Sequence, residues 1–393
     1  MKVLLRAPLL TNSGYGVHSR QVFQWLFGKK DIDLTVECLQ WGRTSWILNP
    51  EYENGMIEKI MSCSKPIEKG TYDITFQVQL PDEWDVTLGK KNVGITAAVE
   101  SDRCSAKWID ACNKMDHVVV PSVFTKNVLK RSGILTKNIT VIEEWFNPKV
   151  MSNSSITKSL NTNENFKKIE KPFNFLIVGQ LTGQKPEDDR KNLLNTIAWL
   201  CEEFKDEKDV GIVLKTNFGK GTNIDKTQTR KFFKENISQI RNSEFPSIQL
   251  IHGNLSESEI AALYHHNKIK AYALATRGEG YGLPFIEAAA SGLPIIATNW
   301  SGHLQFLEKE NFYPVDYEMT DVPKSKIDGR IFIEGVKWAN PLKEDFMKQA
   351  RSLYENYYEA KEKAKIMKKN ILHNFNSAAI CKKYDKLFEE MIK

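Results

Sequence analysis

The chain alternates between short apolar runs and longer amphipathic segments along most of its 393 residues. In the first part, this pattern predicts strands at 2–10, 33–39, 73–80, 92–100, 116–122 and 138–145. Helical periodicity lies between several of them, at 14–27, 105–115 and 123–133. Parallel strands need crossover connections of a dozen or more residues, and these are usually helices. The first part therefore predicts a parallel, doubly wound α/β sheet.

The pattern is interrupted at 147–172, where Asn, Ser and Lys are frequent and apolar residues are few. The alternation then restarts, with strands predicted at 173–180, 210–217, 247–254, 268–276 and 294–297, and helices at 189–205, 226–241, 256–266 and 284–291. In the helix at 256–266, Ser256 and Glu259 have the spacing of a capping box. The last part of the chain is strongly helical.

These shifts predict four parts. Residues 1–146 form an N-terminal Rossmann-like domain, and 147–172 form a linker with a flexible insertion. Residues 173–340 form a second Rossmann-like domain, and 341–393 form a helical tail that braces the two domains. In such α/β folds, ligands bind at the carboxyl ends of the parallel strands.

Composition fits this division, because 393 residues suit two domains of about 150–200 residues each. The 41% hydrophobic and 26% charged content is typical of a soluble globular protein. No apolar run reaches the ~20 residues that span a bilayer. The six cysteines are scattered without a C-x-x-C pair, so neither a disulfide framework nor a zinc site is indicated, and a cytoplasmic location is expected. A net charge of +6 permits an anionic ligand without requiring one.

The richest chemical signal is the segment TRGEGYGLPFIEAAASG, which follows the strand at 268–276. Pro284 suits the first turn of a helix, and Gly292 suits its end. Backbone N–H groups at such a helix start favour an anion. Glu279 and Glu287 lie on either side of this helix start, so we expect them to bind sugar hydroxyls while the backbone binds a phosphate. Glu287 stands among apolar residues, where a charge without a partner is costly.

Two cations, Arg190 and Lys191, are predicted at the start of the helix at 189–205. Cations at a helix N-terminus oppose the helix dipole, and a bound anion would offset that cost. Lys215, at the end of another strand, is a weaker candidate for the same role. The alternative is a solvated basic pair beside the acidic residues 187–189.

The block EGYGLPFIE resembles the E-x7-E signature of retaining GT-B glycosyltransferases of the family-4 type (glycosyl transferases group 1). The resemblance extends over most of the chain, through the segments SGYG, PSVFTKNVLKRSG, IVGQ with RKN, and VLKTN. It implies an α/β protein with the GT-B fold, in which two Rossmann-like domains face each other and a helical tail follows. The sequence also looks like glycosyltransferases found in phage genomes.

The resemblance implies specific roles for the site residues. Glu279 would hold the donor sugar, and Glu287 would hold the ribose of the nucleotide. Arg190 and Lys191 would neutralise the donor diphosphate and stabilise charge on the leaving group. The other donor-binding candidates are Gly14, Gly16, Asn254, Gly280, Tyr281, Gly282 and Leu283.

Acceptor candidates lie in the first domain. His18 follows the glycine loop, and its alternative is a surface histidine in the first helical turn. Trp41 and Arg43 belong to an aromatic and basic loop that suits stacking on a sugar or base, with core packing of the tryptophan as the alternative. Glu100 and Asp102, after another strand, could orient the acceptor hydroxyl.

The function expected is retaining transfer of a hexosyl or pentosyl group from a nucleoside-diphosphate sugar, UDP- or GDP-linked, to an acceptor hydroxyl, with no metal and no other cofactor. The acceptor is a saccharide or, as an alternative, a hydroxymethylated base in phage DNA. A DNA substrate would give strongly salt-dependent binding. A second alternative is a non-catalytic module that binds nucleotide sugars. No stable insertion into a membrane is expected.

Overall fold

The computed structural model describes residues 1–393 except Arg43, Val99 and Asn242. The chain divides into two compact units, and each is described by itself. Unit 1 comprises Met1–Trp145, Ile327–Val336 and Ser377–Lys393. Unit 2 comprises Phe146–Lys326 and Lys337–Asn376.

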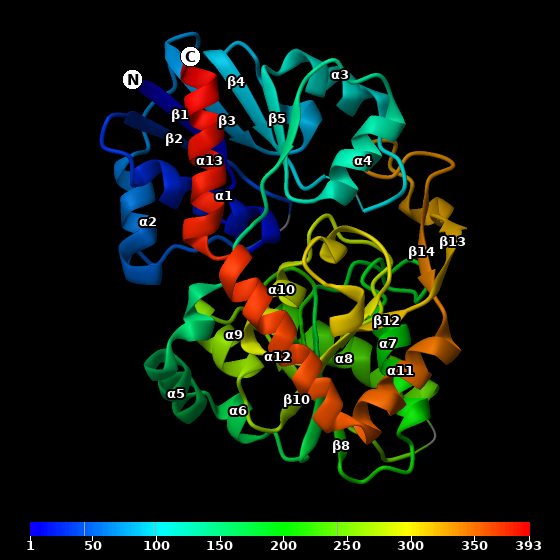
Figure 1. Ribbon diagram of the computed structural model, residues 1–393. Helices are drawn as coiled ribbons and strands as arrows, with labels where there is room; N and C mark the ends of the chain where they lie inside the picture. The colour runs from blue at the N-terminus through cyan, green and yellow to red at the C-terminus, as the bar shows by residue number, and fades with distance from the viewer. Residues whose placement is uncertain (43, 99, 242) are drawn as a thin grey trace. The chain divides into compact units, whose positions relative to one another are not determined.

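Unit 1 is built on a six-stranded parallel sheet of order β2-β1-β3-β4-β5-β6 (Figure 1). Its strands are β1 (Lys2–Ala7), β2 (Asp33–Cys38), β3 (Tyr72–Val78), β4 (Gly89–Ile95), β5 (His117–Val120) and β6 (Ile139–Val141). Its helices are α1 (Gly14–Phe27), α2 (Tyr52–Ser62), α3 (Ala106–Lys114), α4 (Val123–Ser132) and α13 (Ser377–Ile392). The parallel doubly wound sheet predicted for this half is confirmed, although β4 ends at Ile95, five residues before the predicted end.

Unit 2 repeats this plan with a sheet of order β12-β11-β10-β7-β8-β9, again all parallel. Its strands are β7 (Phe173–Val178), β8 (Val210–Thr216), β9 (Ser247–His252), β10 (Ile269–Leu274), β11 (Ile295–Thr298) and β12 (Tyr313–Val315). Its helices are α5 (Asn153–Thr162), α6 (Glu164–Lys167), α7 (Leu193–Glu203), α8 (Asn223–Ile240), α9 (Glu257–Tyr264), α10 (Leu283–Ser291), α11 (Lys343–Glu355) and α12 (Tyr357–Asn374). An antiparallel hairpin, β13 (Tyr317–Asp321) with β14 (Lys337–Pro341), was not predicted.

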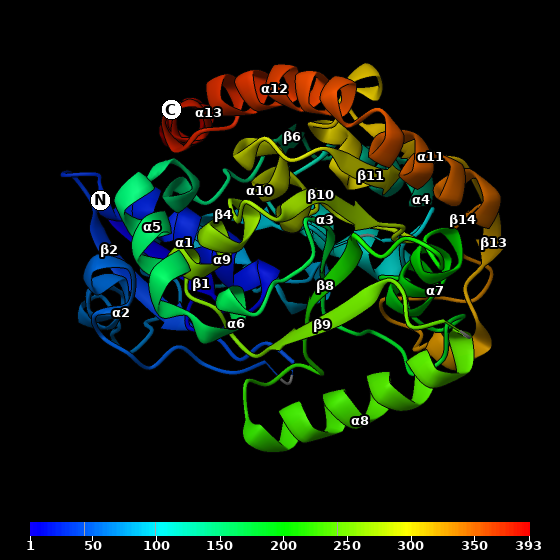
Figure 2. The ribbon, with the colours of Figure 1, turned by 90° about the horizontal axis from the view of Figure 1, so that it is seen from below.

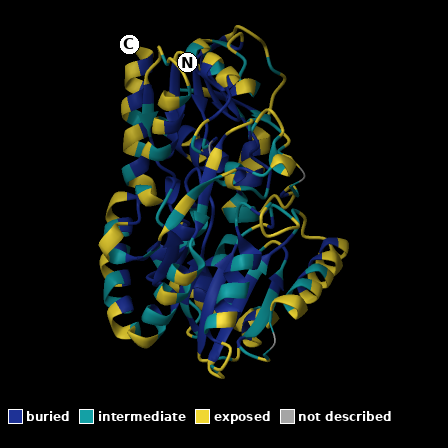
Figure 3. Cartoon of the chain, turned by 90° about the vertical axis from the view of Figure 1, so that its right-hand side faces the viewer, coloured by how far each residue is buried: buried dark blue, intermediate teal, exposed yellow. Residues whose placement is uncertain are grey.

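The central strands of unit 2 are buried on both faces, as Figure 3 shows in dark blue. All six residues of β7, FNFLIV, are buried. A parallel strand covered by helices on both faces has such a continuous apolar run. Figure 2 shows α8 beside β9, one edge strand of this sheet, and α11 contacts β12, the other edge strand.

Several helix ends form where the sequence predicted them. The Ser256–Glu259 capping box is present at α9. Gly292 ends α10 in the left-handed conformation, with φ 79°, and Pro284 lies in the first turn of that helix. These ends depend on local geometry, which is why the sequence alone located them.

The segment 147–172 differs from the predicted flexible insertion, because it folds as η2 (Pro148–Met151), α5 and α6. Ser152 and Asn163 cap the two α-helices. The few apolar residues of the segment, including Ile156 and Phe166, are buried in the core of unit 2. Packing against α9 compensates for the sparse apolar content, a contribution that composition does not reveal.

The helical tail is confirmed, and its helices divide between the two units. Helices α11 and α12 pack in the core of unit 2 through residues such as Phe346 and Ile371. Helix α13 packs in the core of unit 1 through Ile380, Tyr384 and Leu387. Among the described residues, no helix is both long and apolar enough to cross a bilayer.

Candidate functional site

The site in unit 2 is built from two loops that follow the neighbouring strands β7 and β10. The first loop carries Arg190 and Lys191, and the second carries Glu279. The backbone N–H of Arg277 donates to the carbonyl of Arg190 at 2.8 Å and fastens the two loops together. Parallel strands bring their carboxyl ends to one edge of the sheet, so these segments meet although 88 residues separate Lys191 from Glu279.

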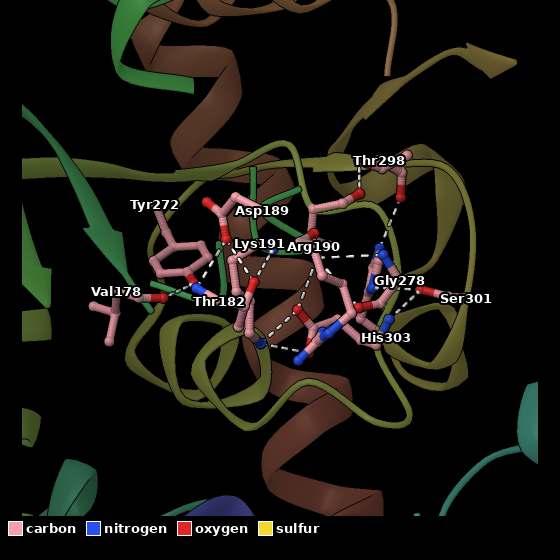
Figure 4. A network of polar contacts seen from close by, with 12 residues as sticks. Val178, Thr182, Asp189, Arg190, Lys191, Tyr272, Gly278, Thr298, Ser301 and His303 are labelled. Carbon is pink, nitrogen blue, oxygen red and sulfur yellow. Dashed lines mark hydrogen bonds and ion pairs between the residues drawn. The ribbon is translucent and has the colours of Figure 1, made fainter. Parts of the chain in front are cut away.

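Glu279 accepts hydrogen bonds from several partners. One of them, Lys191, is labelled beside Arg190 in the polar network of Figure 4. Lys191 Nζ lies 2.7 Å from both carboxylate oxygens. Thr276 Oγ1 donates to Oε1 at 2.9 Å, and Arg190 Nη1 lies 3.7 Å from Oε2. Arg190 Nη1 also donates to the carbonyl of Gly278. The carboxylate and the two cations that the sequence analysis singled out are therefore in contact.

Burial of Glu279, which is 5% exposed, opposes its ionisation. Lys191 and Arg190 outweigh this effect, so the pKa of Glu279 lies below its ordinary value. The carboxylate is therefore charged at neutral pH. The side chains of Arg190 and Lys191 are 12% and 13% exposed, which excludes the solvated basic pair considered from the sequence. An ammonium has three N–H donors, so Lys191 keeps one beyond the two that face Glu279.

A histidine that the sequence analysis missed supports the backbone of Glu279. His303 Nε2 donates to the carbonyl of Thr298 at 2.7 Å, and Ser301 Oγ lies 3.4 Å from Nδ1. Ser301 Oγ accepts from the backbone N–H of Glu279 at 3.0 Å. Burial lowers the pKa of His303, so the ring is neutral, protonated on Nε2 and able to accept at Nδ1. In the sequence, the only indication of a role for His303 was its position shortly after a strand predicted to be buried.

Ser301 has φ 90°, which is unusual for a residue other than glycine. Such a conformation costs of order 1–3 kcal/mol and persists only where the surroundings impose it. Here the strained residue carries the hydroxyl that fixes the Glu279 amide. The strain therefore lies at the site and contributes to its geometry.

The sequence predicted the two cations at the start of a helix. In the structure, they lie just before that helix. Helix α7 begins at Leu193, after Asn192 in a left-handed conformation with φ 56°. Asp189 accepts from the backbone N–H of Leu193 at 2.7 Å and from Thr182 Oγ1. The Asp189 carboxylate accepts from a backbone N–H at the start of the helix and complements the helix dipole. The two cations therefore do not carry the cost of opposing that dipole.

Arg277 is a second residue that the sequence analysis did not single out. It is 4% exposed, and its Nη1 donates to the carbonyls of Pro186 and Asp189 at 2.8 and 2.7 Å. Its guanidinium lies over the ring of Trp338, 5.6 Å from the centroid. Arg277, which belongs to the loop after β10, therefore holds the loop after β7 in place.

Glu287 lies in α10, beside Tyr264 of α9 and Lys215 of β8. Burial raises its pKa to about 7, and the tyrosine hydroxyl and the lysine charge reduce that effect. Lys215 is itself half-buried, and burial lowers its pKa while Glu287 raises it. The structure thus places Lys215 beside the second glutamate of the motif, whereas the sequence had suggested a place among the phosphate-binding cations.

The glycine-rich turn brings the backbone of Gly280 close to Gly302. A Cβ on Gly302 would lie 2.1 Å from the carbonyl oxygen of Gly280 and 2.7 Å from that of Glu279. Gly282 has φ 101° and precedes Leu283, where α10 begins. The ring of Tyr281 is buried against Phe306, with centroids 5.1 Å apart.

Replacing Gly302 by alanine is expected to displace Glu279 and to reduce any activity of the site together with stability. No rotamer relieves the clash, because Cβ is fixed by the backbone. The loss of unfolding free energy should exceed about 1 kcal/mol. Urea unfolding measures it, and Gly28→Ala is the control, because Gly28 has φ −74° and an added Cβ would meet only ordinary contacts at 3.5 and 3.6 Å. A fully stable Gly302→Ala variant would contradict this packing.

The donor candidates of unit 1 lie where α1 begins. Gly14 is the first residue of the helix, and Ser13 caps it by accepting from the backbone N–H of Gly16 at 3.0 Å. A Cβ on Gly16 would lie 2.1 Å from the carbonyl oxygen of Thr11. Gly16 is therefore required by close packing inside this loop, independently of any ligand.

His18 is buried rather than at the surface, with 2% exposure. Its Nε2 lies 3.2 Å from the hydroxyl of Tyr384, and burial lowers its pKa to about 4. The neutral ring therefore contacts α13 within unit 1. This position gives His18 a packing role in the structure as it stands.

Trp41 stacks on Tyr15, with ring centroids 4.0 Å apart and an interplanar angle of 23°. The hydroxyl of Tyr15 accepts from the backbone N–H groups of Ala97 and Ala98 at 3.1 and 3.0 Å. Core-type packing of the tryptophan thus accounts for its position. Burial raises the pKa of the Tyr15 hydroxyl, and the charge of nearby Glu100 adds a smaller increase.

The structure gives less information on the two other acceptor candidates, Asp102 and Arg43. Asp102 is half-buried, 3.6 Å from Arg103. Arg43 lies outside the described residues. In unit 2, Asn254 is exposed just beyond β9. Across the described part of the chain, no group of three or more His, Cys, Asp or Glu residues is arranged to hold a metal ion.

Comparison with known proteins gives a family match for part of the chain and similar folds for the whole of it. A family model described as glycosyl transferases group 1 matches residues 229–313, which include Glu279 and Glu287. A glycosyltransferase from Rickettsia africae has a TM-score of 0.67 at 14% identity, covering 100% of this chain and 98% of its own. None of the curated proteins matches the sequence.

Two further solved structures are similar over their whole length. Anabaena HepE, solved in complex with UDP and glucose, has a TM-score of 0.65 at 12% identity, covering 99% of this chain and 100% of its own. Sucrose-phosphate synthase from Thermosynechococcus elongatus has a TM-score of 0.63 at 14% identity, covering 100% and 99%. At such identities, the likeness establishes the fold alone. The chain therefore has the GT-B fold of two Rossmann-like domains with C-terminal helices, and its residues 229–313 match the group 1 glycosyl transferases.

Proposed function

We propose that this protein is a retaining glycosyltransferase that moves a sugar from a nucleoside-diphosphate sugar to an acceptor hydroxyl without a metal ion. The contact of Lys191 with both carboxylate oxygens of Glu279 carries the proposal. It unites the group expected to hold the donor sugar with a cation expected to hold the diphosphate. The match to group 1 glycosyl transferases covers the Glu279–Glu287 motif and supports the same reaction.

The chemistry follows from these charges. The bond between the anomeric carbon and the phosphate oxygen breaks, and negative charge develops on the departing diphosphate. Lys191 and Arg190 would stabilise that charge, which is usually the largest contribution in such catalysis. The acceptor oxygen bonds to the same face of the anomeric carbon, and its proton passes to the leaving phosphate. Glu279 would orient the sugar and keep both cations in place.

A UDP-linked hexose is the first donor to test, since the structure of HepE includes UDP and glucose. UDP-, GDP- and ADP-glucose should be compared by calorimetry, and slow hydrolysis of the bound donor should be followed by NMR. We expect UDP-glucose to bind and to release α-glucose first. Release of β-glucose would contradict retention, and the absence of binding by every nucleotide would contradict the proposed function. Saccharides and hydroxymethylated DNA are then compared as acceptors.

Nucleotide binding should weaken as the pH falls through 7, because ribose hydroxyls would bind the ionised form of Glu287. With a pKa of about 7, the carboxylate is about 90% ionised at pH 8 and about 10% at pH 6. UDP affinity should therefore fall several-fold more between pH 8 and pH 6 in the native protein than in Glu287→Gln. Titration of UDP itself is common to both proteins, so the difference isolates Glu287. Equal pH dependence in the two proteins would refute this role.

The same substitution should stabilise the empty protein at high pH. The folded pKa of Glu287 is above the ordinary 4.5, so the folded state binds a proton more tightly than the unfolded state. The contribution of this group to stability is thus largest below pH 4.5 and is lost as the pH rises through 7. Glu287→Gln should melt several degrees higher than the native protein at pH 8, with a smaller gain at pH 5. Higher stability with weaker nucleotide binding is typical of a functional carboxylate.

A further inference from the structure

A buried hydrogen-bonded pair lies in unit 2, at the end of β9. His252, the last residue of that strand, places Nε2 2.6 Å from Oδ2 of Asp225, in the first turn of α8. Their side chains are only 3% and 9% exposed. Pairs of this kind add little net stability compared with apolar residues of the same shape, because both groups lose their hydration. The better-attested role of such a pair is to fix the position of the nearby backbone.

Asp225 also fixes the loop that joins β8 to α8. Its Oδ2 accepts from the backbone N–H of Phe218 at 3.2 Å, and its own N–H donates to Thr222 Oγ1 at 3.2 Å. Within the loop, Asn217 Oδ1 accepts from the N–H of Gly219 at 3.0 Å. One carboxylate therefore connects the start of this loop, the start of α8 and the end of β9.

The loops after β8 and β9 meet beyond this hydrogen-bonded pair. A Cβ on Gly221 would lie 3.0 Å from Asn254 Nδ2 and 3.5 Å from the backbone nitrogen of Asn254. Gly253, between His252 and Asn254, has φ 101° and nothing within 4 Å of an added Cβ. The backbone turns sharply there, in open space, directly after the residue that Asp225 holds.

The strand that leads into the first of these loops lies near the glutamate expected to bind ribose. Lys215 is the penultimate residue of β8, and its charge acts on Glu287. The base of a nucleotide lies next to its ribose, and ligands of parallel α/β sheets bind beyond the carboxyl ends of the strands. The loops after β8 and β9 therefore occupy the place available to the nucleobase.

We propose that Asp225 and His252 are positioning residues, which set the loops 217–222 and 253–254 for contact with the nucleobase of the donor. The inference rests on the proposed function and adds the residues that determine base selectivity. Neither side chain need touch the ligand. Their hydrogen bond fixes the relative position of two loops that lack a regular secondary structure of their own.

The test compares His252→Phe, which keeps a ring but removes the hydrogen bond, with His252→Gln, whose amide can donate to Asp225. Calorimetry measures the affinities for UDP, GDP and ADP, and kinetics measure KM and kcat for the preferred donor. We expect His252→Phe to raise the UDP dissociation constant and KM about tenfold and to reduce base selectivity, with kcat within about twofold. His252→Gln should restore most of the affinity. Asp225→Ala, which removes the acceptor, should behave like His252→Phe.

Each outcome decides a different claim. If the native protein binds no nucleotide, the proposed function itself fails. If it binds one, and folded His252→Phe keeps the native affinity and base selectivity, the positioning role is overturned. A fall in kcat at unchanged KM also overturns it, because loops that contact the base act on binding. Thermal unfolding shows whether a variant is folded, and Asp225→Ala replaces His252→Phe in the test if His252→Phe does not fold.

Discussion

Replacing Glu279 by glutamine is expected to lower sugar transfer by about 10²–10³-fold, the usual effect of removing one preorganised electrostatic group from an active site. Glutamine keeps the shape of the side chain and can accept from Lys191, but it lacks the charge that holds Lys191 and Arg190 and orients the sugar. Initial rates of transfer or of donor hydrolysis measure the loss. We expect kcat to fall more than the affinity for free UDP, because UDP lacks the sugar.

The matched control is Glu310→Gln, an exposed carboxylate of the same unit. It should leave rate and stability unchanged. Native transfer by a correctly folded Glu279→Gln protein would show that the site assignment is wrong. A variant that binds neither UDP nor donor would instead indicate that Glu279 acts by holding the fold of the two loops.

Replacing Lys191 by alanine is expected to reduce both turnover and stability. The diphosphate would lose a charged donor, at a cost of about 10²–10³-fold in kcat/KM. In the empty protein, buried Glu279 would keep only Arg190, at 3.7 Å, as its counter-charge. Breaking a buried pair on one side costs about 3–5 kcal/mol when no other counter-ion is present, so a somewhat smaller loss is expected here.

The pH dependence identifies the cause of that lost stability. The pKa of Glu279 is below the ordinary 4.5, so its ion pairs stabilise the protein above that pH and are lost as the pH falls. Lys191→Ala should therefore be less stable than the native protein at pH 7, and the difference should shrink toward pH 3. Lys185→Ala, an exposed lysine of the same loop, is the control. A stability difference that does not vary with pH would show that the loss of stability does not arise from Glu279.

The sequence by itself determined the features that depend on short spacing. The buried run of β7, the capping box of α9 and the left-handed Gly292 all follow from local rules of burial and dihedral angles. The alternation of strands and helices determined the two parallel sheets. The position of Glu279 and Glu287 around a helix start followed from the glycine and proline pattern.

Local rules were insufficient where burial comes from distant segments. Residues 147–172 are polar enough to suggest a linker, yet they form helices because α9 covers their few apolar side chains. The boundary of α7 was predicted too early because Asp189 accepts from the N–H of Leu193 and supplies the cap, and a carboxylate there has no unique sequence signature.

Only the tertiary structure decided which charges meet. Lys191 and Glu279 are 88 positions apart and come together because β7 and β10 are neighbours in the sheet, an order that sequence spacing does not encode. The same is true of His303 behind Glu279 and of Asp225 with His252. Helix propensity and hydrophobic period act over a few residues, whereas an ion pair depends on strand order and on the burial that removes competing water.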